Sequence, residues 1–193
     1  MIEELGSLCE VSEVPIYEFK GKKPKIDEGA FVSPLAVLVG DVEVGEGSSI
    51  FPGAVIRGDI VKIKIGRYSN IQDNVVIHGG YIYDKGKYKG NIPVKIGDYV
   101  SVTHSAVIHG CIIEDVSMIG IGAKIFDGVK VGSGSIVGIG TVVLKGTIIP
   151  ERSVVVGTPG RVIRKVSDDE RAMIMDNALR YFELAKSMKG IIF

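Results

Sequence analysis

The sequence predicts an all-β fold, a parallel β-helix of hexapeptide repeats, followed by one C-terminal α-helix. The first observation is composition, because 27 Ile and 26 Val stand against 7 Leu, with 26 Gly and no Trp. β-Branched side chains pack well on strands and lose freedom in helices, so this balance favours short strands joined by glycine turns. The second observation is a six-residue repeat of aliphatic residues, and the third is a change of period near residue 160.

Residues 15–166 form the predicted β-helix domain, and residues 1–14 are an N-terminal extension to which no pattern assigns a structure. Period six fits neither an amphipathic helix nor a hairpin, but it fits a short strand plus a tight corner with one buried aliphatic side chain. Three such units close one triangular coil. The breaks at 57–64 and 78–95 are predicted to be loops at coil corners. The longest unbroken run of the repeat is Ile113, Ile119, Ile125, Val131, Val137, Val143, Ile149 and Val155.

Residues 167–190 are predicted to form an amphipathic helix that packs along the β-helix. Ser167 and Glu170 have the spacing of a capping box, and Gly190 lies just past the expected end. The predicted packing face consists of Met175, Leu179, Phe182 and Ala185.

Charge and targeting patterns exclude several classes of partner. The chain carries 23 basic and 23 acidic side chains, so it offers no polycation for nucleic acid. Nowhere do 18 apolar residues run together, and the first residues lack the apolar stretch of a signal peptide. We therefore expect a cytoplasmic protein with no nucleic-acid or membrane partner. Cys9 and Cys111 lack the spacing of a disulfide framework or a metal-binding pair.

The three histidines, His78, His104 and His109, all fall in the middle of the repeat. Counting coils places His78 and His109 at the same outward phase of adjacent coils, about 4.8 Å apart, with Arg57 one coil below. His104 lies on another face, one coil above Asp73. A lone outward histidine is usually a surface residue, but three in two registered columns favour a metal site. Zinc takes about four ligands, commonly three from the protein. The ligand set is therefore most naturally completed if a neighbouring copy supplies the third imidazole, as in a cyclic trimer.

This spacing resembles that of the γ-class carbonic anhydrases, hexapeptide-repeat proteins with a left-handed β-helix. The flanking segments that carry the resemblance are Arg57-Gly-Asp59, Asn70-Ile-Gln72-Asp73-Asn74 and Ile108-His-Gly-Cys111. The resemblance implies a homotrimer with a metal at each subunit interface, bound by His78 and His109 of one chain and His104 of the next. It also implies an ion-pair network of Arg57, Asp59 and Asp73 across that interface, and a Gln72 side chain that approaches the metal-bound solvent.

A divalent metal with three neutral imidazoles keeps a charge of +2, which lowers the pKa of bound water toward about 7. The resulting hydroxide could hydrate CO2 to bicarbonate, the carbonate dehydratase reaction, with Gln72 orienting the reactants. Zn²⁺ is the expected cofactor, and Fe²⁺ or Co²⁺ would also accept imidazole ligands.

The chain departs from the resemblance where active family members carry proton-shuttling glutamates. Ile60 follows Asp59, and the segment 79–90 holds Asp84 as its one acid against three lysines, which predicts slow hydration. Asp84, Tyr81, Tyr83 and Tyr181 are the candidate replacements for the missing shuttle. Three other functions stay open: a metal-dependent acyl-CoA thioesterase, a hexapeptide acyltransferase that uses one histidine as a base, and a non-catalytic metal-binding scaffold. Metal content separates the acyltransferase from the others.

Overall fold

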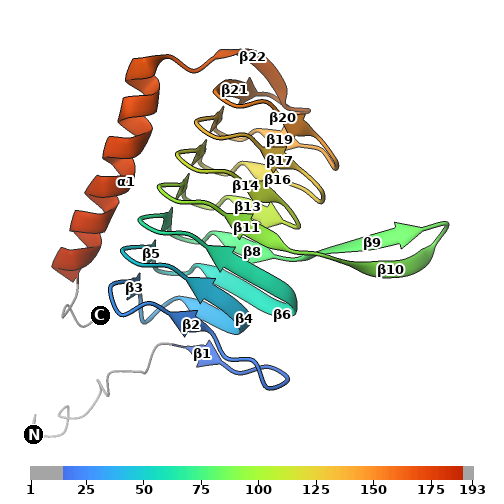
Figure 1. Cartoon of the computed structure of the whole chain (residues 1–193), viewed down its shortest axis with the longest axis vertical. Helices are drawn as coiled ribbons and strands as arrows, with labels where there is room; N and C mark the ends of the chain where they lie inside the picture. The colour runs from blue at the N-terminus through green and yellow to red at the C-terminus, as the bar shows by residue number, and fades with distance from the viewer. Residues whose placement is uncertain (1–14, 189–193) are drawn as a thin grey trace, which may run out of the picture.

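A computed structural model describes residues 15–188 and shows a triangular prism of short parallel strands with one long helix beside it (Figure 1). The predicted β-helix of hexapeptide repeats followed by a C-terminal helix is confirmed. The predicted extension at 1–14 lies outside the described residues, as do Lys189 and Gly190. The division of the chain into three segments stays a prediction.

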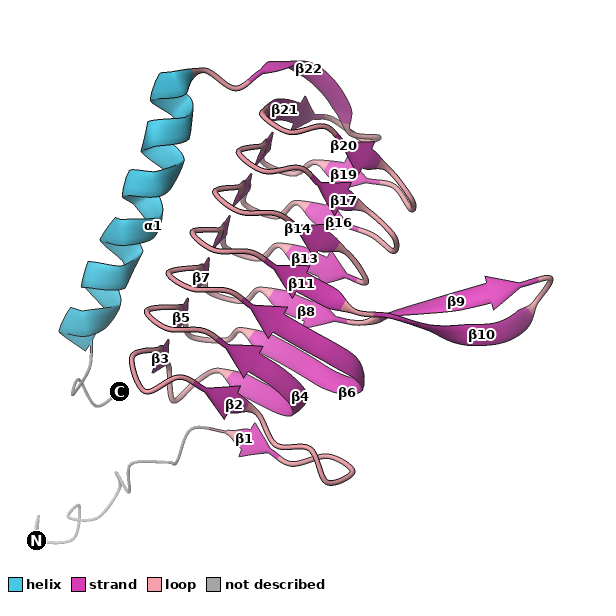
Figure 2. Cartoon of the chain, in the orientation of Figure 1, coloured by secondary structure: helices cyan, strands magenta, loops and turns pink. Residues whose placement is uncertain are grey.

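Three faces, called A, B and C below, make up the prism, and the chain passes through them in the order A, B, C in each coil (Figure 2). Face A contains β1 (Ile16–Tyr17), the first parts of β4 (Val37–Val44) and β6 (Val55–Ile65), β8 (Val76–His78), β13 (Val107–His109), β16 (Lys124–Ile125) and β19 (Val142–Val143). Face B contains β2 (Lys25–Ile26), the second parts of β4 and β6, β11 (Val94–Ile96), β14 (Ile112–Ile113), β17 (Lys130–Val131) and β20 (Ile148–Ile149).

Face C is a separate ladder, and the helix packs on it. Its strands are β3 (Phe31–Val32), β5 (Ser49–Ile50), β7 (Asn70–Ile71), β12 (Ser101–Val102), β15 (Met118–Ile119), β18 (Ile136–Val137) and β21 (Ser153–Val156). The antiparallel strand β22 (Arg161–Lys165) follows β21 and leads the chain into the helix.

The interior of the prism is filled by the aliphatic residues of the repeat. In face A, Ile56, Ile77, Ile108 and Ile125 stand above one another in register, and each is at most 1% exposed. Burying one such side chain contributes about 1.5–3 kcal/mol relative to leaving it in water. The six-residue period therefore sets the register of the strands, and with it the position of every outward side chain.

Two segments predicted to be corner loops are strands instead. Residues 57–64 belong to β6, which runs around the corner from face A to face B beside β4. Within 78–95 the chain forms an antiparallel hairpin of β9 (Gly80–Asp84) and β10 (Lys87–Ile92), which projects well away from the prism (Figure 1). Its turn places Lys85 and Gly86 at φ angles of 47° and 74°, and two positive values match the tight turn that right-twisted hairpins prefer.

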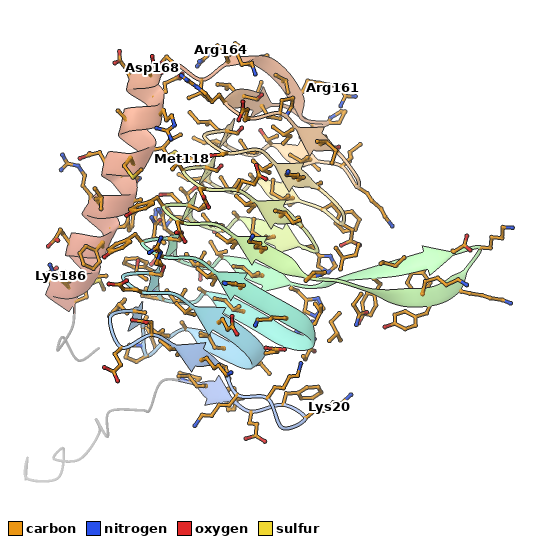
Figure 3. The ribbon with its side chains drawn as sticks, viewed as in Figure 1. Lys20, Met118, Arg161, Arg164, Asp168 and Lys186 are labelled. Atoms are coloured by element: carbon orange, nitrogen blue, oxygen red, sulfur yellow. The ribbon has the colours of Figure 1, made fainter. Side chains whose placement is uncertain are left out.

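The C-terminal helix α1 (Asp168–Met188) begins with the predicted capping box. The Glu170 amide donates to Ser167 Oγ at 3.1 Å, and the Ser167 amide donates to Glu170 Oε2 at 2.9 Å. Arg164 and Asp168, at the junction of β22 and α1, lie at one end of the prism, and Lys186 lies near the other end of α1 (Figure 3). Among the described residues, no helix is long and apolar enough to cross a membrane.

The packing face of α1 differs in part from the prediction. The buried side chains are Ile174, Ala178 and Ala185, and Leu179 is 42% exposed. The side chain of Leu179 was therefore assigned to the wrong side of the helix, because a strip of four apolar residues tolerates more than one rotation of the helix against face C.

Candidate metal centre

The strands of face A lie between two corners that carry the histidines. The leading edge is the corner at which the chain enters face A from face C, and the trailing edge is the corner at which it leaves. His78 and His109 lie at the trailing edge, where β8 pairs with β13 and the two histidines are direct neighbours. Arg57 pairs with His78 from the strand below. The predicted column of Arg57, His78 and His109 is confirmed.

Two ring nitrogens at the trailing edge are spaced as ligands of one metal would be. His78 Nδ1 and His109 Nε2 lie 3.3 Å apart, and the two ring centroids are 5.3 Å apart. Nitrogens bound tetrahedrally to zinc at about 2.0–2.1 Å are about 3.3–3.4 Å from each other. The pair of imidazoles therefore fits a divalent metal.

Each of the three histidines contacts an aspartate through one ring nitrogen. For His78 and His109, this is the nitrogen that does not belong to the 3.3 Å pair. His78 Nε2 lies 3.0 Å from Asp59 Oδ1, and His109 Nδ1 lies 2.6 Å from Asp127 Oδ1. At the leading edge, His104 Nδ1 lies 2.8 Å from Asp73 Oδ2. A carboxylate that accepts the proton of one nitrogen fixes the tautomer and leaves the opposite nitrogen with a free lone pair. This arrangement is typical of metal-binding histidines.

Electrostatics at the trailing edge favour neutral imidazole and charged carboxylate. Burial lowers the pKa of His78 below its ordinary value of 6.5, although the hydrogen bond with Asp59 acts in the opposite direction. Burial opposes ionisation of Asp59, but its bonds with His78 and Arg57 outweigh burial and hold the pKa of Asp59 below 3.8. The Arg57 guanidinium is paired with Asp59. At neutral pH, the His78 lone pair is therefore available to a cation.

His104 lies at the leading edge, one coil above Asp73 as predicted, and its side chain is 43% exposed. Among residues 15–188 of a single chain, no group of three His, Cys, Asp or Glu side chains is close enough to hold a metal ion. One chain therefore presents two imidazoles at the trailing edge, too few to complete a metal site, and a single imidazole at the leading edge.

Gln72 lies beside Asp73 but does not point into solvent. It is 1% exposed, and its amide nitrogen donates to Asn70 Oδ1 at 2.9 Å. The Asn70 amide in turn donates to Ser101 Oγ at 2.9 Å. This chain of hydrogen bonds fixes the Gln72 side chain next to the leading edge.

Asp127 and Phe126 are residues of this site that the sequence analysis missed. The Phe126 ring stacks on His109 with centroids 5.6 Å apart and an interplanar angle of 22°. The Asp127 side chain is 9% exposed and fits between Gly80 and Gly110. A Cβ added to Gly80 would lie 2.2 Å from Asp127 Oδ1, and one added to Gly110 would lie 2.6 Å from it. Continuing the column from Ile108 to Ile125 would have placed Phe126 above His109 and Asp127 next to it.

Fold and site together define a class: a hexapeptide-repeat β-helix protein with histidine–aspartate pairs at two opposite edges of one face. Known proteins identify the family within that class. No family model matches the chain. A Methanocaldococcus jannaschii protein named "Probable carbonic anhydrase" is 44% identical over 165 residues, which cover 86% of this chain and 98% of that protein.

Plant relatives carry the same family name, and a solved structure has the same fold. Gamma carbonic anhydrase 1, mitochondrial, of Arabidopsis thaliana is 43% identical over 167 residues, which are 86% of this chain and 59% of the plant protein. A crystal structure of a hexapeptide transferase family protein from Anaplasma phagocytophilum has a TM-score of 0.82 at 28% identity, covering 90% of this chain and 98% of that one. The chain belongs to the γ-class carbonic anhydrase family.

Proposed function

We propose that three copies of the chain assemble around a three-fold axis, with face A of each copy turned toward the axis. Neighbouring copies share a metal site at each contact. This assembly is supported by the outer surface of face A, where most strands present an aliphatic side chain at the same outward position and β16 presents Lys124. Val76 is 41% exposed, and its neighbours in the column are half-buried. The four consecutive valines from Val37 to Val107 form an apolar strip on the outside of the sheet, which is typical of an interface, and Lys124 separates them from Val142. The outward column of valines is Val37, Val55, Val76, Val107 and Val142.

The two edges of face A match each other row by row. A three-fold axis brings the trailing edge of one copy against the leading edge of the next. In each coil, the residue at the trailing edge of face A comes five positions after the residue at the leading edge. We call such a pair of edge residues a row, and in the trimer the leading-edge residue of one copy meets the trailing-edge residue of the next. In that pairing, a carboxylate meets an imidazole in one row, two imidazoles meet in the next, and apolar side chains meet in the other two. The rows are Asp73 with His78, His104 with His109, Ile121 with Phe126, and Ile139 with Leu144.

In the proposed site, His78 and His109 of one copy and His104 of the next copy hold a divalent cation. Bound there, the cation would act as a Lewis acid that makes hydroxide available from water near neutral pH. Asp59, Asp127 and Asp73 keep the protons of the three imidazoles on the nitrogens that face away from the cation.

We propose CO2 hydration to bicarbonate as the reaction of this site. The observation that carries the proposal is the 3.3 Å separation of His78 Nδ1 and His109 Nε2, each ring held from behind by a carboxylate. Membership of the γ-class family supports the same reaction. The chain spans 59% of the length of the Arabidopsis relative, so the activity is proposed for this chain on its own residues. Zn²⁺ as the cation and the cytoplasm as the location are proposed on the sequence alone.

Two of the candidate proton relays, Asp84 and Tyr181, are poorly suited, which supports slow turnover. Asp84 is at the tip of the hairpin, four residues from Gly80, which is about 13 Å along a strand. Tyr181 lies near the leading edge, where burial and the charge of Asp73 raise its pKa above 10.0. Neither side chain is placed to accept a proton from the site at pH 7.

The proposal is tested by metal analysis of anaerobically prepared protein, followed by a stopped-flow CO2 hydration assay, on the wild type and on His104→Ala. We expect about one cation per wild-type chain and loss of both metal and hydration in the variant. Asp98→Asn is the matched control, because Asp98 pairs with Arg67 at a corner without histidines. A metal-free wild type that binds acetyl-CoA would instead support acyl transfer; the Anaplasma relative is named a hexapeptide transferase family protein.

A further inference from the structure

The β9–β10 hairpin is an arm with an exposed aromatic surface that projects from the prism (Figure 1). Its base is held by its own chain, where Asn91 donates to the Ile60 carbonyl at 2.8 Å and Tyr81 and Tyr88 border a pocket shared with Phe19 and Lys22. Its tyrosine rings gather in one cluster, with centroids 6.2–6.4 Å apart. Tyr83 and Tyr88 are 59% and 56% exposed, and Ile82 is 42% exposed. An isolated two-stranded ribbon is marginally stable in water, so such a surface favours a partner.

The hairpin starts at the trailing edge, immediately after the metal-site residue His78 and Gly79. It points away from the helix of its own chain, which lies on the opposite side of the prism (Figure 1). In the proposed trimer, the trailing edge meets the leading edge of the next copy. The arm therefore leaves its own chain at the position where the next copy begins.

One side of α1 borders the leading edge. The Tyr181 ring packs edge-on against Phe51 at 5.3 Å, and Phe51 lies at the corner between β5 and β6. Phe182 packs against Tyr68 at the opposite corner of face C. Leu184, 47% exposed, lies about 60° from Tyr181 around the helix, whereas Leu179 lies about 140° from Leu184. Tyr181 and Leu184 therefore lie on the side of the helix next to the leading edge, the edge that meets the neighbouring copy in the proposed trimer.

The arm and the helix also have opposite charges. Residues 80–92 contain three lysines and one aspartate, a net charge of +2. Residues 168–188 contain five acidic and three basic side chains, a net charge of −2. The like charges of two arms disfavour contact between arms. Beside Tyr181 and Leu184 the helix carries Arg180, Glu183 and Lys186, and Asp168 and Glu170 pair with arginines outside the helix, so the contact with α1 rests on its apolar side chains.

We propose that the β9–β10 hairpin of each copy lies on α1 of the next copy, with its tyrosines against Tyr181 and Leu184. This inference rests on the proposed trimer and extends it, because the arm begins at His78 and its far end is held by the chain that supplies His104. The occupant of the tyrosine surface is thus a second copy of this chain.

The test is chemical cross-linking of engineered cysteines in the full chain. Tyr83→Cys and Leu184→Cys are combined in a Cys9→Ser background, where the remaining Cys111 is buried. Treatment with a short bismaleimide is expected to give covalently linked dimers and trimers on a denaturing gel. The matched control combines Tyr83→Cys with Leu179→Cys, whose side chain is similarly exposed but faces away, and is expected to give monomers.

Sedimentation and metal analysis of the same variants separate failure of this inference from failure of the proposed function. A trimeric, metal-loaded protein that shows no 83–184 cross-link, or links 83–179 equally well, would overturn the arm contact and leave the shared metal site intact. A monomeric protein without metal would overturn the shared site and the arm contact together.

Discussion

Replacement of Asp127 tests whether the carboxylates behind the histidines hold the metal ligands. Asp127→Asn keeps the size of the side chain and its place between Gly80 and Gly110, but removes its charge. The hydrogen bond between His109 Nδ1 and Asp127 Oδ1 is 2.6 Å long, and the Asp127 side chain is 9% exposed while that of His109 is 25% exposed. Hydrogen bonds to charged groups contribute about 1.5–3 kcal/mol, and loss of a partner behind a metal ligand weakens metal binding about 10- to 100-fold.

The assay is a competition titration of the metal-free protein with Zn²⁺ and a chromophoric chelator, which reports the dissociation constant without an activity measurement. Asp115→Asn is the control, since Asp115 accepts a backbone amide at 2.9 Å far from the histidines, and its metal affinity should equal that of the wild type. The reasoning is refuted if Asp127→Asn binds Zn²⁺ as tightly as the wild type while His109→Ala does not bind it.

Three further predictions follow from the packing and the charges. Ile108→Ala removes a fully buried side chain and should destabilise the metal-free protein by about 2–5 kcal/mol in chemical unfolding, while Ile148→Ala, 65% exposed, should change it by less than about 0.5 kcal/mol. Gly80→Ala would put a Cβ 2.2 Å from Asp127 Oδ1, so it should displace Asp127 and lower the metal content; wild-type metal content would contradict the role of Asp127 in holding His109. The bonds to Arg164 and Ser167 lower the pKa of Glu170 from 4.5 to about 2, so the stabilisation by its charge is complete above pH 4.5 and lost as the pH falls through 2. The difference in Tm between wild type and Glu170→Gln should therefore shrink over that interval, and a difference independent of pH would contradict it.

The repeat predicted the β-helix and the histidine columns because one buried aliphatic per strand leaves little freedom of register. With Ile77 and Ile108 fixed inside, His78 and His109 had to be neighbours on the outside. The same reasoning predicted that His104 stands above Asp73.

Features outside the period were harder to predict. The repeat stops at the hairpin and therefore predicts a loop there, although Tyr81 and Tyr83 alternate before a Lys85-Gly86 turn, which is a hairpin signal in its own right. The hydrogen bond of Asp127 depends on a side-chain position that the column alone does not fix. The rotation of α1 depends on the aromatic packing of Tyr181 and Phe182 at two corners of face C, which the helical period does not encode.

The shared metal site is tested most directly by mixing two defective chains. His104→Ala keeps the trailing-edge pair, and His109→Ala keeps the leading-edge imidazole. If each site needs both edges from different copies, trimers reassembled from equal amounts of the two variants should bind about one quarter of the wild-type metal, because three quarters of them are mixed and each mixed trimer completes one of three sites. Metal bound by either variant alone at the wild-type level, or none bound by mixed trimers, would contradict the account.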